Sequence, residues 1–194
     1  MEAIEAYANG ADQLELCSHL EEDGLTPDYE LVQDVVEAVD IPVKVMIRSR
    51  GGNFVYTSEE LNVMCVQLKA LIELPIAGIV VGALTPDNKL DMPTIRALCA
   101  TAENLDATIH KCIDEIDDYA SAINSLKSIP NVKCILTSGT KKTAEEGKQI
   151  LKEMMKLASP EIQIIPAGKI LASNLENLDA YIGATIYHGR RVVS

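Results

Sequence analysis

The chain has 194 residues, a length that suits one domain, including a domain of barrel type. Aromatic residues make up only 4% of it, so we expect an aliphatic core. The net charge of −12 argues against nucleic-acid binding and against binding to anionic membranes, because an acidic surface repels phosphate groups.

The N-terminal sequence and the cysteine usage predict a cytoplasmic protein. The opening residues, MEAIEAYANGAD, lack the basic and apolar regions of a signal peptide. No apolar run approaches the roughly 20 residues that a membrane-spanning helix needs. Five cysteines without CxxC spacing predict reduced thiols rather than a disulfide framework.

Helical patterns alternate with short apolar runs along the chain. The first ten residues predict a helix that ends at Asn9-Gly10, and residues 28–39 and 58–73 carry apolar side chains at helical spacing. The apolar runs are mostly β-branched, as in strands buried on both faces. We predict seven strands: Gln13–Ser18, Val43–Arg48, Gly78–Leu84, Ala107–Cys112, Lys133–Ser138, Ile162–Ala167 and Ala184–Gly189.

This alternation predicts an α/β protein with a parallel sheet. Its regular repeat of about 29 residues favours a TIM-type (β/α)₈ barrel over a doubly wound sheet, with residues 1–194 as one domain. The chain opens on a helix and ends just after a predicted strand, so the first strand and the last helix of the barrel are missing. Either the barrel is incomplete or the native chain is longer. Unpaired edges of an incomplete barrel predict a homo-oligomer, because proteins normally cover such edges.

The tetrapeptide LTPD occurs twice, at Leu25–Asp28 and at Leu84–Asp87, each time after a predicted strand. Thr and Asp cap helices, and Pro suits the first helical turn because its missing N–H would be unpaired there. We therefore predict that both copies begin helices and lie on one rim of the barrel. Local turn chemistry used twice explains the repeat without any function.

Polar residues lie at the predicted strand ends, where barrel enzymes place their active sites. Arg48 and Arg50 flank a double-glycine turn, and guanidinium groups suit carboxylate or phosphate ligands. The loops Thr137–Thr140 and Pro166–Lys169 contain small residues that expose backbone N–H groups to a phosphate, although plain turns look the same. His110 is a candidate base, metal ligand or satisfied core histidine.

Other residues allow both a structural and a functional interpretation. Glu15 and Lys44 lie on neighbouring predicted strands and form either a simple buried pair or part of a site. Cys65, Cys99 and Cys134 fit core positions. Cys17 and Cys112 lie at strand ends and are the plausible soft-metal ligands.

Four blocks resemble the CutC family of copper homeostasis proteins. They are GADQLELCSHLEEDGLTPD, IPVKVMIRSRGGNFVYTSEEL, GIVVGALTPDNKLD and CILTSGTKKTAEEGKQIL. The resemblance implies a cytoplasmic TIM barrel associated with copper tolerance and described as copper-binding. It places the metal or active site at the following residues: Cys17, Arg48, Arg50, His110, Asp114 and His188.

The chain also departs from the family pattern. The family's first strand, with its Glu and Cys, is absent, and a Phe-His-Arg-Ala-Phe-Asp block reads Ile109–Asp114 here. Strands 2 and 5 of an eight-strand ring stand roughly 12 Å apart. The sulfurs of Cys17 and Cys112 would then lie roughly 7 Å apart, too far to share one ion. Cys17 is thus the candidate copper ligand.

Two functions follow as hypotheses, with an inactive paralogue as a third possibility. The first is Cu(I) binding through the Cys17 thiolate, which suits a soft ion. The second is an enzyme acting on a small anionic or phosphorylated metabolite. In the second, the anion-binding residues are Arg48, Arg50, Ser138, Gly139 and His188, and the catalytic residues are His110, Asp114 and Glu15. The sequence leaves open whether any reaction is catalysed.

Overall fold

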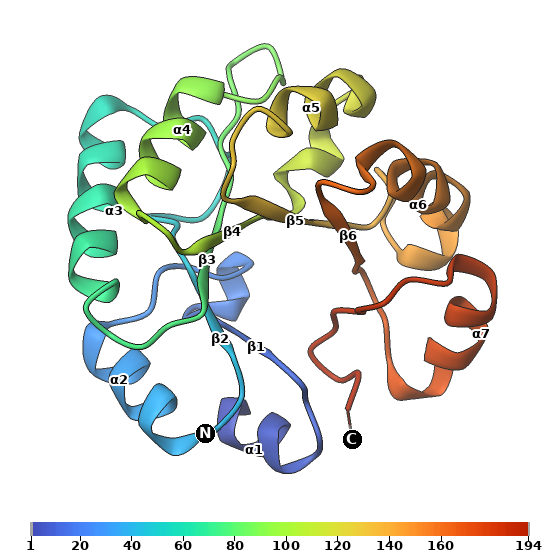
Figure 1. Cartoon of the computed structure of the whole chain (residues 1–194), viewed down its shortest axis with the longest axis horizontal. Coiled ribbons are helices and arrows are strands. Elements are labelled where there is room, and N and C mark those ends of the chain that lie inside the picture. The colour runs from blue at the N-terminus through green and yellow to red at the C-terminus, as the bar shows by residue number, and fades with distance from the viewer. Residues whose placement is uncertain (1, 194) are drawn as a thin grey trace.

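The protein is an open, curled parallel sheet with helices on its convex face, as a computed structural model of residues 2–193 shows (Figure 1). The strands follow chain order: β1 (Leu14–Leu16), β2 (Val43–Met46), β3 (Gly78–Val81), β4 (Asp106–Ile109), β5 (Val132–Thr137) and β6 (Gln163–Pro166). The helices lie between them: α1 (Glu2–Ala8), α2 (Tyr29–Ala38), α3 (Ser58–Leu71), α4 (Met92–Thr101), α5 (Tyr119–Leu126), α6 (Ala144–Ala158) and α7 (Ala172–Ile182). Two short 3₁₀ helices, η1 (Leu20–Glu22) and η2 (Lys111–Glu115), follow β1 and β4. The predicted barrel architecture is confirmed in its incomplete form.

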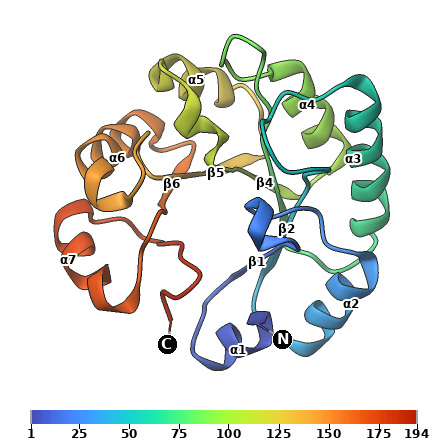
Figure 2. The same cartoon turned by 180° about the vertical axis from the view of Figure 1, so that it is seen from behind.

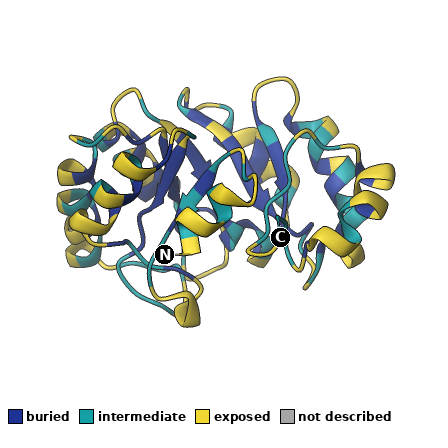
Figure 3. Ribbon diagram, turned by 90° about the horizontal axis from the view of Figure 1, so that it is seen from below, coloured by how far each residue is buried: buried dark blue, intermediate teal, exposed yellow. Residues whose placement is uncertain are grey.

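Burial explains why the strand sequences lack polar alternation. All residues of β2 and β3 are buried, because one face of the sheet packs on helices and the other faces the barrel interior. Figure 3 shows the strands buried and the outer faces of the helices exposed. The core is aliphatic, with Val45, Ile79 and Ile135 fully buried.

The seventh predicted strand is wrong. Residues Ala184–Gly189 run beside β6 but make one backbone bond to it, from His188 N to Pro166 O at 2.9 Å. A strand ladder needs repeated bonds of this kind, and this segment instead leaves α7 through Gly183 in a left-handed conformation. The gap in the barrel therefore lies between β1 and β6, and both ends of the chain lie beside it (Figure 2).

The gap is bridged by side chains rather than by a strand. Arg190, in the C-terminal segment, forms an ion pair with Glu2 of α1 at 2.6 Å. Within residues 2–193, β1 pairs with β2 alone and β6 with β5 alone. Each therefore has one edge without a strand partner. No helix in the same range is long and apolar enough to cross a membrane.

The two LTPD segments lie on the rim formed by the strand ends, but only one leads directly into a helix. α2 begins at Tyr29, and its cap residue Asp28 makes no side-chain capping bond. The second copy is a separate turn in which Thr85 Oγ1 donates to Asp87 at 2.7 Å. α4 begins later and is capped by Asp91, so the predicted helix start at the second copy is wrong.

Candidate functional site

A cavity of about 360 Å³ opens at the carboxyl ends of the strands. Five of the predicted site residues line it, contributed by four separate parts of the chain: Glu15, Arg48, His110, Asp114 and His188. Because parallel strands end at the same rim, residues far apart in sequence meet there. The structure thus gathers these side chains as the strand-end pattern predicts.

Arg48 is buried and holds together the loops that follow β1 and β2. Its Nη1 donates to the carbonyls of Glu22, at 2.8 Å, and Gly24, at 3.3 Å. Its Nη2 donates to Gly52 O at 2.8 Å. The guanidinium carbon lies 4.8 Å from the centre of the Phe54 ring, a cation–π contact. The remaining donor, Nε, is buried and has no partner within residues 2–193.

His110 is a neutral, buried imidazole beside Arg48. β4 ends at Ile109 and Lys111 already belongs to η2, so the predicted strand Ala107–Cys112 extends too far. His110 Nδ1 accepts a bond from Cys112 N at 3.1 Å, which places the ring hydrogen on Nε2. Nε2 is buried without a partner within residues 2–193. Burial, together with the charge of Arg48, lowers the pKa of His110 to about 3.

The approach of His110 to the rim depends on a glycine. A Cβ atom on Gly82 would lie 2.5 Å from the Cε1 atom of His110 and would overlap the sulfur of Cys112. On the opposite side, the Phe54 ring lies 4.8 Å from the imidazole centre. Phe54 therefore contacts both Arg48 and His110. Sequence reasoning missed it, although it is the single Phe of the chain and directly follows the arginine loop.

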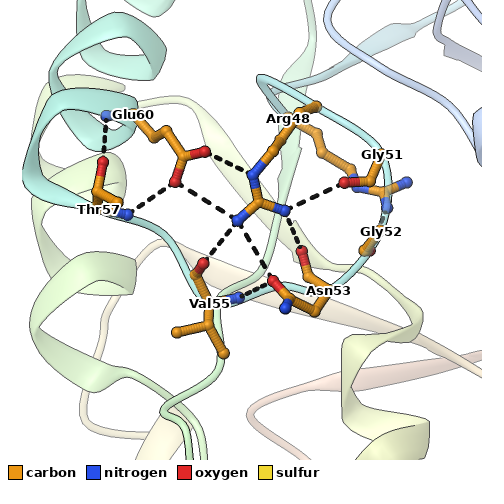
Figure 4. Close-up of polar contacts among 8 residues, drawn as sticks. Arg48, Gly51, Gly52, Asn53, Val55, Thr57 and Glu60 are labelled. Atoms are coloured by element: carbon orange, nitrogen blue, oxygen red, sulfur yellow. Dashed lines mark hydrogen bonds and ion pairs between the residues drawn. The ribbon is translucent and has the colours of Figure 1, made fainter.

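Arg50 does not line the cavity. Its contacts organise the loop before α3 and the start of that helix, where Figure 4 labels Asn53, Val55, Thr57 and Glu60. Its guanidinium forms an ion pair with Glu60 and donates to the carbonyls of Asn53, at 2.8 Å, and Val55, at 2.7 Å. Glu60 also accepts from Thr57 N, which caps α3. All three guanidinium nitrogens are used within this loop. We therefore leave Arg50 out of the proposed anion site.

The Asp114 carboxylate binds the backbone amides of the loop Thr137–Thr140, which the sequence predicts as a phosphate-binding loop. Its carboxylate accepts bonds from Ser138 N at 3.0 Å, Ser138 Oγ at 2.8 Å and Thr140 N at 2.9 Å. Thr137 Oγ1 donates to the same carboxylate, and Gly139 N donates to Thr137 Oγ1 at 2.9 Å. The chain's own carboxylate therefore fills the position that an anion would take at Ser138 and Gly139.

Glu15 and Lys44 do not form the buried pair that sequence reasoning considered. They are register partners on β1 and β2, yet Lys44 Nζ donates to Thr108 Oγ1 at 3.1 Å. Glu15 lies instead 3.8 Å from His188 Nδ1, across the gap in the barrel. The pair fails because Lys44 reaches over β3 toward β4, and the sequence cannot show that direction.

Cys17 is a partly buried thiol next to Glu15. Burial and the nearby Glu15 carboxylate raise the pKa of this thiol to about 11. Cys112 is fully buried, and burial raises the pKa of its thiol well above the usual range. Cys99 and Cys134 are buried as expected, whereas Cys65 is only partly buried.

Within residues 2–193, one group of three potential ligand side chains is close enough to share a metal ion. It consists of His19, Glu21 and Glu22, all exposed on or beside η1, and it contains no cysteine. Carboxylate oxygens suit hard ions rather than Cu(I). Among the described residues, Cys17 therefore belongs to no group of three such ligands.

A family model and individual protein sequences all relate this chain to the same family. The CutC family model matches residues 1–193. The human copper homeostasis protein cutC homolog is 37% identical over 186 residues, covering 96% of this chain and 68% of the human protein. The CutC protein of Klebsiella pneumoniae (strain 342) is 38% identical over 174 residues, covering 89% of this chain and 69% of its own length.

Solved structures agree. The crystal structure of CutC from Streptococcus agalactiae superposes with a TM-score of 0.89 and 30% identity, covering 94% of this chain and 90% of that one. Dihydrodipicolinate synthase from Cyanidioschyzon merolae superposes with a TM-score of 0.66 at 18% identity, covering 97% of this chain and 61% of that one, which shows a shared barrel-type fold. From the family model, the sequence identities and the fold together, the chain belongs to the CutC family.

Proposed function

We propose that this protein binds Cu(I) in the cytoplasm and serves copper homeostasis, with the Cys17 thiolate as the principal ligand. Two observations support the proposal. Relatives at 36–37% identity carry copper homeostasis in their names. Cys17 lies just beyond the end of β1, where its thiol is only partly buried and adjoins the Glu15 carboxylate. A cation at this sulfur would be stabilised by the same negative charge that disfavours the free thiolate.

A second soft donor lies on the same side of the rim. A Cβ atom built on Gly24 would lie 3.1 Å from the Cys17 sulfur and 3.8 Å from the terminal methyl of Met46. Thiolate and thioether sulfur are the donors that select Cu(I). Glycine at this position lets the loop pack against both side chains. We therefore propose the Met46 thioether as a second donor to a Cu(I) ion held by Cys17.

The test is an anaerobic Cu(I) titration against a chromophoric chelator under reducing conditions. Wild-type protein should take one Cu(I) from the chelator, and Cys17→Ser should abolish that transfer. Cys65→Ser is the matched control, because Cys65 is also partly buried but lies on α3. Equal Cu(I) binding by wild type and Cys17→Ser would refute the assignment. Equal loss in Cys65→Ser would show that binding is not specific to Cys17.

A second candidate function is binding and conversion of a small anionic metabolite at the rim cavity. One observation favours it. Arg48 Nε and His110 Nε2 are both buried, both carry hydrogen, and both lack partners within residues 2–193 while their residues line the same cavity. Leaving such donors unpaired costs about 1–3 kcal/mol each, unless a ligand accepts from them. Phe54 holds the two side chains together.

Inorganic phosphate is the simplest probe of this site. Wild-type protein should show saturable phosphate binding by ³¹P NMR line broadening. Arg48→Lys should weaken it, because an ammonium lacks the Nε donor while keeping the charge. Cys17→Ser should bind phosphate normally. Circular dichroism must show that Arg48→Lys is folded, and His110→Asn supplies a second test if it is not. Absence of both copper and phosphate binding would favour an inactive paralogue.

We also propose that two copies associate through the open edges of the sheet. β1 and β6 each lack a second strand partner within residues 2–193, and exposed edges pair readily with other chains. Sedimentation equilibrium should give a mass of a dimer or larger against 21.0 kDa for one chain. A monomer at all concentrations tested would refute this proposal.

A further inference from the structure

Lys44 is a buried lysine inside the curled sheet. Its side chain is only 7% exposed. It starts on β2 and passes over β3, so that Nζ lies 3.1 Å from Thr108 Oγ1 on β4 and 3.7 Å from Cys134 Sγ on β5. Its register partner on β3 is Gly78, and a Cβ there would lie 3.4 Å from Lys44 Cγ, an ordinary contact distance.

The groups around the ammonium are neutral. Within residues 2–193, no carboxylate forms an ion pair with Lys44 Nζ within 4.0 Å. Two of its three hydrogens point to a hydroxyl and a thiol, and the third is free. Thr108 accepts from Lys44 and keeps its own hydroxyl hydrogen for donation. Burying a charge without an opposite charge is costly. This cluster of donors is therefore complementary to a carboxylate.

A cavity of about 450 Å³ adjoins this cluster. Lys44, Thr108, Glu15 and His188 all line it, and Glu15 lies 3.8 Å from His188 Nδ1 across the gap between β1 and β6. Glu15, on the neighbouring strand β1, is the register partner of Lys44 but forms no ion pair with it. A ligand with a carboxylate at one end and a hydroxyl or amino group at the other would match both sides of the cavity.

We propose that this cavity binds a small hydroxy- or amino-carboxylate. Its carboxylate accepts from Lys44 and Thr108, and its hydroxyl or amino group donates to Glu15. The site differs from the copper proposal in its main contacts, which are Lys44 and Thr108 instead of Cys17 and Met46, although both proposals place Glu15 beside the bound group. It also lies deeper in the barrel than the Arg48 and His110 donors, since Lys44 and Thr108 precede the strand ends.

The test is a titration of the ¹⁵N-labelled full chain, followed by two-dimensional NMR at constant ionic strength. The probes are glycolate, glycine, acetate and the neutral glycolamide. Glycolate and glycine should cause saturable shifts in β2, β4 and β5, acetate should bind more weakly, and glycolamide should cause none. No saturable shift with glycolate or glycine up to about 50 mM, corresponding to under about 2 kcal/mol of binding free energy, would overturn the proposal. Equal binding of acetate would overturn the role of Glu15.

Matched lysine variants locate the site. Lys44→Met should weaken glycolate binding at least about tenfold, since it removes a charge-assisted hydrogen bond. Lys133→Met is the control, because Lys133 is exposed on β5, and it should bind like wild type. Cys65→Ser, on α3, is a second control and should also bind like wild type. The titration is made without added copper, which separates this result from the copper test. If Lys44→Met does not fold, Thr108→Val provides the same test with a smaller, several-fold loss. Unchanged binding in the folded variant would refute the site.

Discussion

Replacing the carboxylate of Asp114 tests how much its hydrogen bonds to the loop Thr137–Thr140 stabilise the fold. In Asp114→Asn the side chain keeps one acceptor oxygen but turns an amide NH₂ toward donors. Ser138 N, Ser138 Oγ and Thr140 N then compete for a single uncharged oxygen. Only 11% of the Asp114 side chain is exposed, so water cannot replace the lost acceptor.

The expected loss follows from the number of bonds. Hydrogen bonds to a charged group contribute about 1.5–3 kcal/mol each. Losing two of them predicts a decrease of about 3–6 kcal/mol in the free energy of unfolding, which overlaps the cost of about 3–5 kcal/mol for breaking a buried ion pair. Urea unfolding followed by far-UV circular dichroism measures this change. Asp117→Asn, an exposed neighbour, is the control and should unfold like wild type.

Asp114→Ala adds a second readout. Removing the carboxylate frees the amides of Ser138 and Thr140, which then form a nest for an external anion. Inorganic phosphate should raise the unfolding midpoint of Asp114→Ala more than that of wild type or Asp117→Asn. A loss below about 1 kcal/mol in Asp114→Asn would contradict the charge-assisted estimate. A lack of phosphate rescue would show that the loop does not keep its shape without Asp114.

Three further predictions concern the rim. The folded pKa of His110, about 3, lies below its unfolded value near 6.5, so its contribution to stability is present above pH 6.5 and is lost as the pH falls toward 3. His110→Asn should therefore flatten the acid side of the stability profile by up to about 1.4 kcal/mol per pH unit, and an unchanged slope would contradict the burial argument. Gly82→Ala should lower the free energy of unfolding by about 1–3 kcal/mol in urea titrations, because its Cβ would overlap Cys112, and a neutral effect would show that the rim can shift. With a thiol pKa of about 11, Cys17 should react with iodoacetamide about tenfold faster per pH unit between pH 7 and 10, as mass spectrometry of the modified peptide measures. A rate that levels off above about pH 9 would indicate an ordinary thiol.

The sequence by itself determined the fold class and the family. The run Gly78–Leu84 is apolar throughout, and Val43–Arg48 is apolar except for Lys44 and the terminal Arg48. Short runs of this kind are typical of strands buried on both faces. The alternation with helices then requires parallel pairing, which brings strand ends to one rim. Arg48 and His110 could be placed in one site for that reason alone. These conclusions depend on local pattern and chain order, which the sequence contains directly.

Partners across the sheet were decided only by the tertiary structure. Lys44 and Glu15 are register partners on β2 and β1, but Lys44 Nζ donates to Thr108 on β4 instead. Arg50 and Arg48 lie two residues apart, yet only Arg48 reaches the cavity, because Glu60 holds Arg50 at the start of α3.

The same holds for the open edge and the anion loop. Residues Ala184–Gly189 have the composition of a strand but lack the repeated bonds of a ladder with β6. The sequence near Ser138 predicts a phosphate site, but in the structure the amide of Ser138 donates to Asp114, which lies on a different loop. A strand, an ion pair or an anion site requires a second group at the right distance. The packing of distant segments supplies that group, and no local pattern records it.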